Sequence, residues 1–329
     1  MKAFLFCVVY RDYGAVWCTG GLKVVQIQTI GLKSAKQSVM LMSYFAQILK
    51  NNISNSGRTN QMLRKMVSGL VVLLVLVCIS VAQAEEKASS GKQGAANLNT
   101  TIPVKMDYLI YLPENYDQKE KWPLLLFLHG AGERGDDLDL VTIHGPPMLA
   151  KNGKQFPFIV VSPQCPKDQL WQPVELTALL NEIEKKYRVD KDRIYVSGLS
   201  MGGFGTWSLA AYTPYRFAAL VPICGGGEKF WVKKIKHVPI WVFHGAKDTA
   251  VPLERSQSLV DVLKKAKSDV KFTVYPDAGH NSWTETYDNP KVYEWLLKQK
   301  RKPESEVKAA EKKEEEARKA KRAAAKKKK

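Results

Sequence analysis

Residues 122–128 read Trp-Pro-Leu-Leu-Leu-Phe-Leu and run without a polar residue into His-Gly-Ala-Gly. A strand that is apolar at every position has to be covered on both of its faces. Strand-like segments recur along the chain and alternate with segments of helical spacing. Strands are expected at 107–112, 122–128, 158–161, 193–197, 217–223, 240–244 and 271–275. Helices are expected at 174–187, 201–212, 255–267 and 291–298. This alternation predicts an α/β fold with a mostly parallel central sheet and helices on both faces.

The excess positive charge lies at the two ends of the chain. The net charge is +18, but residues 1–84 hold nine Lys or Arg against one acid, and residues 301–329 hold thirteen against six. The segment between them has 28 basic and 25 acidic residues. A nucleic-acid-binding domain concentrates positive charge on the fold itself. The charge distribution therefore predicts no nucleic-acid partner for the folded part.

Residues 62–84 have the three-part layout of a secretory signal peptide. Arg64 and Lys65 supply the charged start, 70–79 is an apolar run, and Ala-Gln-Ala, ending at Ala84, is a small-x-small cleavage site. The run is shorter than the roughly 20 residues needed to span a bilayer comfortably. We expect a secreted or periplasmic protein that begins after Ala84, with an uncleaved N-terminal anchor as the alternative.

A segment of 61 residues precedes this signal, although a signal peptide normally begins a chain. Met62 and Met66 are both plausible starts. We interpret 1–61 as upstream sequence that is not native to the protein, or as a long leader.

Composition also divides the rest of the chain. Residues 85–102 are rich in Ser, Gly, Asn and Ala and are expected to form a linker, which leaves 103–300 as the catalytic domain. Residues 301–329 are almost wholly Lys, Arg, Glu and Ala. Without an apolar stripe to bury, they predict a solvated tail, helical in part or disordered. Such a tail is also a candidate contact for an anionic surface or polymer.

The sequence Gly198-Leu-Ser-Met-Gly202 matches G-x-S-x-G, a pattern whose meaning depends on its context. Here it follows the strand expected at 193–197 and opens the helix expected at 201–212. A tight strand-to-helix turn raises the serine hydroxyl above the sheet, where a neighbouring base can activate it. Ser200 is therefore the predicted nucleophile; an idle serine in a glycine-rich turn is the alternative.

Chain order selects the base. In this architecture the serine is followed by the acid and then by the histidine. His280 satisfies that order and lies just beyond the last expected strand, in Ala-Gly-His-Asn. The other histidines precede the serine, lie at the wrong end of a strand or have few acids before them; these are His129, His144, His237 and His244.

The acid has to hold the base in the correct tautomer and stabilise its charged form. Asp248 lies four residues past the strand expected at 240–244, at the same edge of the sheet as Ser200 and His280. It is the predicted acid. Glu228, which also follows a strand end, is the second candidate.

Acyl transfer also needs backbone N–H donors for the charge that develops on the carbonyl oxygen. One expected donor is Met201, the residue after the nucleophile, and the other is Ala131 in the His-Gly-Ala-Gly loop, unless that loop is a plain glycine turn. The acidic stretch 133–139 is expected to be a solvated loop, with shaping of the entrance as the alternative. Candidate substrate-pocket residues, of which the tryptophans fit packing roles equally well, are His129, Gly130, Trp171 and Trp283.

Two of the five cysteines, Cys165 and Cys224, lie beyond Ala84. A pair in an exported protein suggests a disulfide, and two buried free thiols are the alternative. The chain has no His-Glu-x-x-His, Walker or Cys-x-x-Cys pattern. We therefore expect no metal, nucleotide or other cofactor.

Several motifs occur together and in one order: 128–136, 162–166, 198–203, 223–227, 244–248 and 279–283. As a set they resemble the secreted bacterial esterases grouped as phospholipase/carboxylesterase, dienelactone-hydrolase-like or predicted-peptidase proteins, which are related to polyhydroxybutyrate depolymerases, feruloyl esterases and the prolyl oligopeptidase catalytic domain. The resemblance covers about 103–300 and implies the α/β-hydrolase fold. The family roles fall on Ser200, Asp248, His280, Met201 and Ala131.

The resemblance leaves the substrate open, because this fold hosts many acyl chemistries. No long insertion lies between Gly205 and Ile240 to form a large lid, which favours short-chain or carbohydrate-linked esters, such as acetyl or feruloyl groups on a polysaccharide. A serine peptidase of the prolyl-oligopeptidase type is one alternative, although the chain has no room for a propeller domain. The other is an inert hydrolase-fold protein held to polyanions by its basic tail.

Overall fold

The computed structural model describes residues 97–327 of the chain. The segment 1–61, the predicted signal peptide 62–84 and most of the expected linker lie outside the described residues. The last linker residues, 97–102, have no regular secondary structure. Of the helices in the described part, none is long and apolar enough to cross a membrane.

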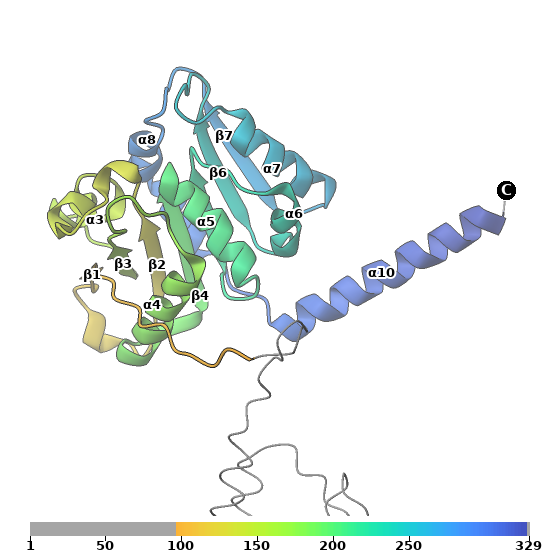
Figure 1. Cartoon of the computed structure of the whole chain (residues 1–329), viewed down its shortest axis with the longest axis horizontal. Coiled ribbons are helices and arrows are strands. Elements are labelled where there is room, and N and C mark those ends of the chain that lie inside the picture. Colours follow the sequence, from red (N-terminus) through yellow and green to blue (C-terminus); the bar gives the residue numbers. More distant parts are fainter. Residues whose placement is uncertain (1–96, 328–329) are drawn as a thin grey trace, which may run out of the picture. The chain divides into compact units, whose positions relative to one another are not determined.

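Within residues 97–327, seven strands form one sheet in the order β1-β3-β2-β4-β5-β6-β7 (Figure 1). The strands are β1 Tyr108–Tyr111, β2 Trp122–Leu128, β3 Ile159–Pro163, β4 Val189–Leu199, β5 Ala219–Ile223, β6 Ile240–Gly245 and β7 Val270–Tyr275. β1 runs antiparallel to β3, whereas the other neighbouring pairs are parallel. The predicted mostly parallel sheet is confirmed.

Helices connect the strands and cover the sheet. The α-helices are α3 Gly145–Lys151, α4 Pro173–Lys186, α5 Met201–Tyr212, α6 Lys229–Val232, α7 Glu254–Lys265, α8 Trp283–Asp288, α9 Pro290–Leu297 and α10 Glu304–Lys327. Short 3-10 turns are η1 Tyr116–Gln118, η2 Ala131–Glu133, η3 Leu138–Thr142 and η4 Lys233–Ile235. The sequence did not predict α3, α6 and α8, because helices of four to seven residues are too short to show an apolar periodicity.

The alternation of side chains along β2 divides the core into two layers. Leu124 and Leu126 belong to a buried cluster that includes side chains of α4, α5 and α7. Leu125 and Phe127 point to the opposite face and belong to a second cluster with α8 and α9. Successive strand residues point to opposite faces, so a strand that is apolar throughout supplies both cores at once. Helices on both faces are the result.

Helix α10 follows the catalytic domain and extends away from the sheet (Figure 1). Val307, near its start, is buried, and Lys236 forms an ion pair with Glu314. Beyond this point nearly all its described side chains are exposed. The tail predicted at 301–329 is therefore helical over most of its length, with only its first half in contact with the domain.

Candidate active site

Ser200 occupies the turn between β4, which ends at Leu199, and α5, which begins at Met201. Its backbone has φ 52° and ψ −116°, a region that a residue with a side chain rarely adopts. The Ser200 N–H donates to the carbonyl oxygen of Ile223 on the neighbouring strand at 3.0 Å, which helps hold the strained turn in place. In this conformation the Ser200 side chain is held at the N-terminal end of α5.

Two glycines of the motif are required by close packing. A Cβ on Gly202 would lie 1.9 Å from the carbonyl oxygen of Leu128, and a Cβ on Gly198 would lie 2.3 Å from the carbonyl oxygen of Gly202. These neighbours are backbone atoms and cannot rotate away. Glycine at both positions therefore lets α5 start directly against the end of β2.

The structure brings Ser200, His280 and Asp248 into one hydrogen-bonded chain. His280 lies in the loop after β7 and Asp248 in the loop after β6. The His280 Nδ1 lies 2.8 Å from Asp248 Oδ2, and its Nε2 lies 2.9 Å from Ser200 Oγ. A carboxylate only accepts hydrogen bonds, so Nδ1 carries the proton of a neutral imidazole and Nε2 accepts from the serine hydroxyl. This arrangement makes Nε2 available as a base.

Asp248 is held by several groups at once. Its side chain is fully buried, and its Oδ1 accepts hydrogen bonds from the backbone N–H groups of Ala250 at 3.0 Å and Val251 at 2.9 Å. The Nε2 of His244 lies 3.2 Å from Oδ2. Sequence reasoning considered His244 only as a possible base and missed this contact with the acid. The position of His244 at the end of a strand, four residues before Asp248, could have indicated that the two side chains lie close together.

The loop after β2 offers the expected backbone donor. The N–H of Gly130 is occupied, since it donates to Glu133 Oε2 at 2.8 Å. Ala131 follows at the start of η2 and lines a pocket together with Ser200 and Met201. The first N–H groups of a helix have no partner within that helix, which applies to Met201 at the start of α5. Ala131 and Met201 thus remain the candidate oxyanion donors.

Glu133 was expected in a solvated loop, and for this residue the prediction was wrong. Glu133 is 7% exposed, and besides the Gly130 N–H it approaches His144 Nε2 at 3.8 Å. Asp136, Asp137 and the rest of the stretch up to residue 139 are more exposed. The carboxylate is buried because it satisfies a backbone donor of the loop three residues before it.

Three predicted pocket residues do not line the pocket. His129 is fully buried, its Nε2 accepts from the backbone N–H of Cys165 at 3.0 Å, and burial lowers its pKa to about 4. Gly130 has its N–H occupied by Glu133 Oε2. Trp283 packs edge-on against the His280 ring, at 5.3 Å between centroids and 87°. His129 thus packs beneath the site, and Trp283 packs against the base instead of facing the pocket.

The pocket beside Ser200 has a volume of about 710 Å³. Trp171 lies on its wall, as predicted, and so does Glu228, the second candidate acid. The carboxylate bonded to His280 is that of Asp248. Four aromatic residues line the pocket together with charged side chains; the set includes Trp171, Phe204, Trp207, Trp231, Arg134 and Arg255. The surface suits a flat or ring-shaped group held next to the serine.

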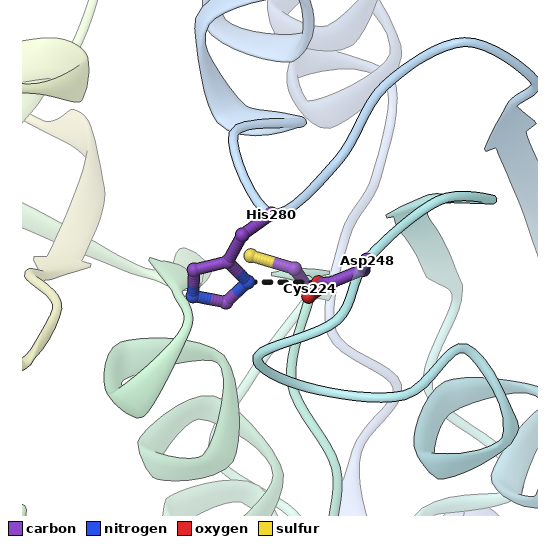
Figure 2. Close-up of side chains that lie close together, drawn as sticks. All are labelled: Cys224, Asp248 and His280. Atoms are coloured by element: carbon purple, nitrogen blue, oxygen red, sulfur yellow. Dashed lines mark hydrogen bonds and ion pairs between the residues drawn. The ribbon is translucent and has the colours of Figure 1, made fainter.

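Cys165 and Cys224 are both free and buried, so the predicted disulfide was wrong. Cys165 follows β3 and Cys224 follows β5, and β2 and β4 lie between those strands. Three strand spacings amount to about 14 Å, whereas a disulfide needs Cα atoms within about 7 Å. Burial raises the pKa of the Cys224 thiol to about 12. Its sulfur lies next to His280 and Asp248 (Figure 2).

The parallel sheet, the strained turn that carries Ser200, and the acid and base at the same edge define an α/β-hydrolase. Residues 166–321 match the model of the Dienelactone hydrolase family. This segment is just under half of the chain, so the chain carries a region similar to that family, and its relatives include esterases.

Relatives with named activities share parts of this chain. The bifunctional acetylxylan esterase/xylanase XynS20E of Neocallimastix patriciarum is 26% identical over 57% of this chain, and a putative carboxymethylenebutenolidase of Yersinia pestis is 30% identical over 28% of it. The alignments span only 28% and 38% of those two proteins. A solved thermostable esterase is 37% identical with a TM-score of 0.53, and the match covers 60% of each chain.

Proposed function

We propose that the protein is a serine carboxylic ester hydrolase that acts through an acyl-enzyme on short-chain or carbohydrate-linked esters. The observation that carries the proposal is the 2.9 Å contact between Ser200 Oγ and His280 Nε2, whose other nitrogen is bound to Asp248. A serine hydroxyl becomes a useful nucleophile only when such a base accepts its proton.

The first half-reaction follows from this geometry. Ser200 Oγ attacks the ester carbonyl while its proton passes to His280 Nε2. The buried Asp248 carboxylate stabilises the imidazolium that forms. His280 then returns the proton to the leaving alcohol, which leaves the acyl group on Ser200. In the second half-reaction, water attacks the acyl-enzyme with His280 again as the base.

Negative charge on the carbonyl oxygen needs fixed donors during both half-reactions. The N–H groups of Met201 and Ala131 are proposed for this role, since both residues border the pocket next to Ser200. One such donor contributes about 2.7–4 kcal/mol to the stabilisation of the transition state. Glu133 supports the same loop by engaging the neighbouring Gly130 N–H.

The substrate class rests on the shape of the pocket and on the relatives. Trp231, which is 47% exposed, offers a flat surface in the pocket on which a sugar or phenolic ring can stack. Between α5 and β6 the chain forms only β5 and the short α6 and η4, so no large lid restricts a polymeric alcohol. The acetylxylan esterase relative acts on such a substrate by its name, which favours polysaccharide esters for this chain.

The test is hydrolysis of p-nitrophenyl acetate and butyrate by the purified protein and by Ser200→Ala, followed by acetylated and feruloylated sugars. We expect activity in the parent and a loss of at least about 10⁴-fold in the variant. Labelling with a fluorophosphonate provides the control. A labelled Ser200 without ester turnover would indicate another acyl substrate, and an unlabelled protein would contradict the serine mechanism.

We also propose that the protein is exported and that α10 can hold it to an anionic polymer. The support is the signal-like segment ending at Ala84 and the exposed basic side chains Arg318, Lys321 and Arg322 in the second half of α10. N-terminal sequencing of the natural protein tests export. A mature chain that retains Met1 would contradict it.

A further inference from the structure

Cys224, Asp248 and His280, whose side chains are of types that can ligate a metal, lie close together (Figure 2). The sulfur of Cys224, a carboxylate oxygen of Asp248 and a ring nitrogen of His280 all lie within 4.8 Å of one another. They follow the ends of β5, β6 and β7, which are neighbours in the sheet. In the part of the chain that the structure describes, this is the one group of three such donors so close together.

We propose that this cluster is an inhibitory zinc site: Zn²⁺ binds Cys224, Asp248 and His280 and switches the hydrolase off. Thiolate, imidazole and carboxylate are the ligands that Zn²⁺ takes in proteins, and three protein ligands with a fourth position for water form a common zinc geometry. The inhibition rests on the proposed function, whereas the metal binding does not. The cluster has no sequence motif because its members come from three separate strand ends.

The nitrogen and oxygen donors of the cluster come to a spacing that fits the ion after a small adjustment, and the Cys224 sulfur lies within 4.8 Å of both. The His280 Nδ1 and Asp248 Oδ2 are 2.8 Å apart. Zn–N and Zn–O bonds of about 2.0–2.2 Å in tetrahedral geometry separate the two ligand atoms by about 3.4 Å. The imidazole and carboxylate thus need to part by about half an ångström. Cys224 and Asp248 are buried, but the His280 side chain is 28% exposed, so its movement opens a path for the cation.

Zinc binding changes where the protons lie. Zn²⁺ takes the Nδ1 lone pair, and the single proton of the neutral His280 ring then resides on Nε2. The Cys224 thiol loses its proton to water as the Zn–S bond forms, so one proton is released for each ion bound. An Nε2 that carries a proton cannot accept the proton of Ser200. The ion also replaces the His280–Asp248 hydrogen bond, and both changes remove the base on which ester cleavage depends.

Cys224 is the discriminating residue, because it belongs to the proposed zinc site but has no part in acyl transfer. The matched control is Cys165, the other buried free thiol, which follows β3 on the far side of two strands. Cys224→Ala and Cys224→Ser remove the thiolate with different loss of volume, and thermal unfolding checks that each variant is folded. All proteins are prepared without a polyhistidine tag, which would itself bind the metal.

The first measurement is ester hydrolysis during titration with ZnCl₂, followed by a chelator. We expect the parent and Cys165→Ala to lose activity and recover it with the chelator. The Cys224 variants should need at least about 100-fold more zinc, since even outer partners of a metal ligand change metal affinity by about 10–100-fold. Equal zinc sensitivity in the parent and in folded Cys224 variants would overturn the proposal.

The second measurement does not depend on activity. Co²⁺ replaces Zn²⁺ at thiolate sites and gives a sulfur-to-metal charge-transfer absorption band. The band should form in the parent and in Cys165→Ala and be absent in Cys224→Ala. Such a result in a protein without esterase activity would support the metal site and contradict the proposed function. No cobalt band in the parent would overturn the metal site, whatever the activity.

Discussion

The buried carboxylate of Glu133 accepts a hydrogen bond from the backbone N–H of Gly130 at 2.8 Å. It thereby restrains the loop that presents Ala131 to the pocket beside Ser200. A hydrogen bond to a charged group contributes about 1.5–3 kcal/mol. The proposed oxyanion donor thus depends on a side chain that does not touch the substrate.

We predict that Glu133→Ala lowers kcat for p-nitrophenyl acetate by about 10–100-fold, with a smaller change in KM, because the loop donor is needed most in the transition state. Glu133→Gln keeps an oxygen acceptor and should recover part of the loss. Steady-state kinetics of both variants provide the check. Equal activity in parent, Ala and Gln proteins would show that the loop holds its shape without this carboxylate.

The acid assignment makes a prediction about tautomers. In Asp248→Asn, the amide no longer requires a proton on His280 Nδ1, and we expect kcat to fall by about 10⁴-fold with the fold intact. Asp277→Asn is the matched control: Asp277 is exposed and pairs with Lys247 on the surface, so its activity should stay within about twofold. If Asp248→Asn retained most of its kcat, another carboxylate would have to support the base.

Close packing around the nucleophile turn predicts contrasting effects of two glycine substitutions. Gly202→Ala would place a Cβ 1.9 Å from the Leu128 carbonyl oxygen, whereas a Cβ on Gly132 meets no atom within 4 Å. We expect Gly202→Ala to lose about 3 kcal/mol of stability or more, or to fail to fold, and Gly132→Ala to change it by less than about 0.5 kcal/mol. Chemical denaturation measures both. Similar stabilities would contradict the tight contact between α5 and β2.

Trp231 should influence which esters are cleaved. Trp231 is 47% exposed and lines the pocket beside Ser200. An aromatic stacking contact contributes about 0.5–1.5 kcal/mol, so Trp231→Ala should lower kcat/KM for feruloyl esters by up to about tenfold and leave acetyl esters nearly unchanged. The control is Tyr212→Ala, since Tyr212 is 56% exposed and does not line the pocket. A loss that is the same for acetyl and feruloyl esters would place the aromatic group elsewhere.

His129 predicts how stability depends on pH. Burial lowers its pKa from 6.5 to about 4, so between these values the unfolded chain binds a proton that the folded protein does not. Stability should therefore fall as pH drops from about 6.5 toward 4, by an amount from this group on the order of 2 kcal/mol between pH 7.5 and 5. His129→Gln should flatten that part of the curve. Denaturation at several pH values tests this, and an unchanged slope would assign the effect to other groups.

The strand and helix order could be predicted from the sequence because it depends on local spacing. A continuous apolar run such as 122–128, and a G-x-S-x-G motif between a strand and a helix, indicate a covered parallel sheet and an exposed Ser200. Chain order and strand ends were enough to choose Asp248 and His280, since the carboxyl ends of parallel strands meet at one edge. The structure places both side chains in the predicted hydrogen-bonded chain with Ser200.

Only the tertiary structure decided which side chains face inward and which distant residues meet. Nothing local distinguishes the buried Glu133 from the exposed acids after it, or shows that His129 turns into the core. The order of strands in the sheet keeps Cys165 apart from Cys224 and places Cys224 beside Asp248 and His280. Contacts of this kind depend on strand order and loop direction, which are set by the packing of the whole domain and leave no periodic signal in the chain.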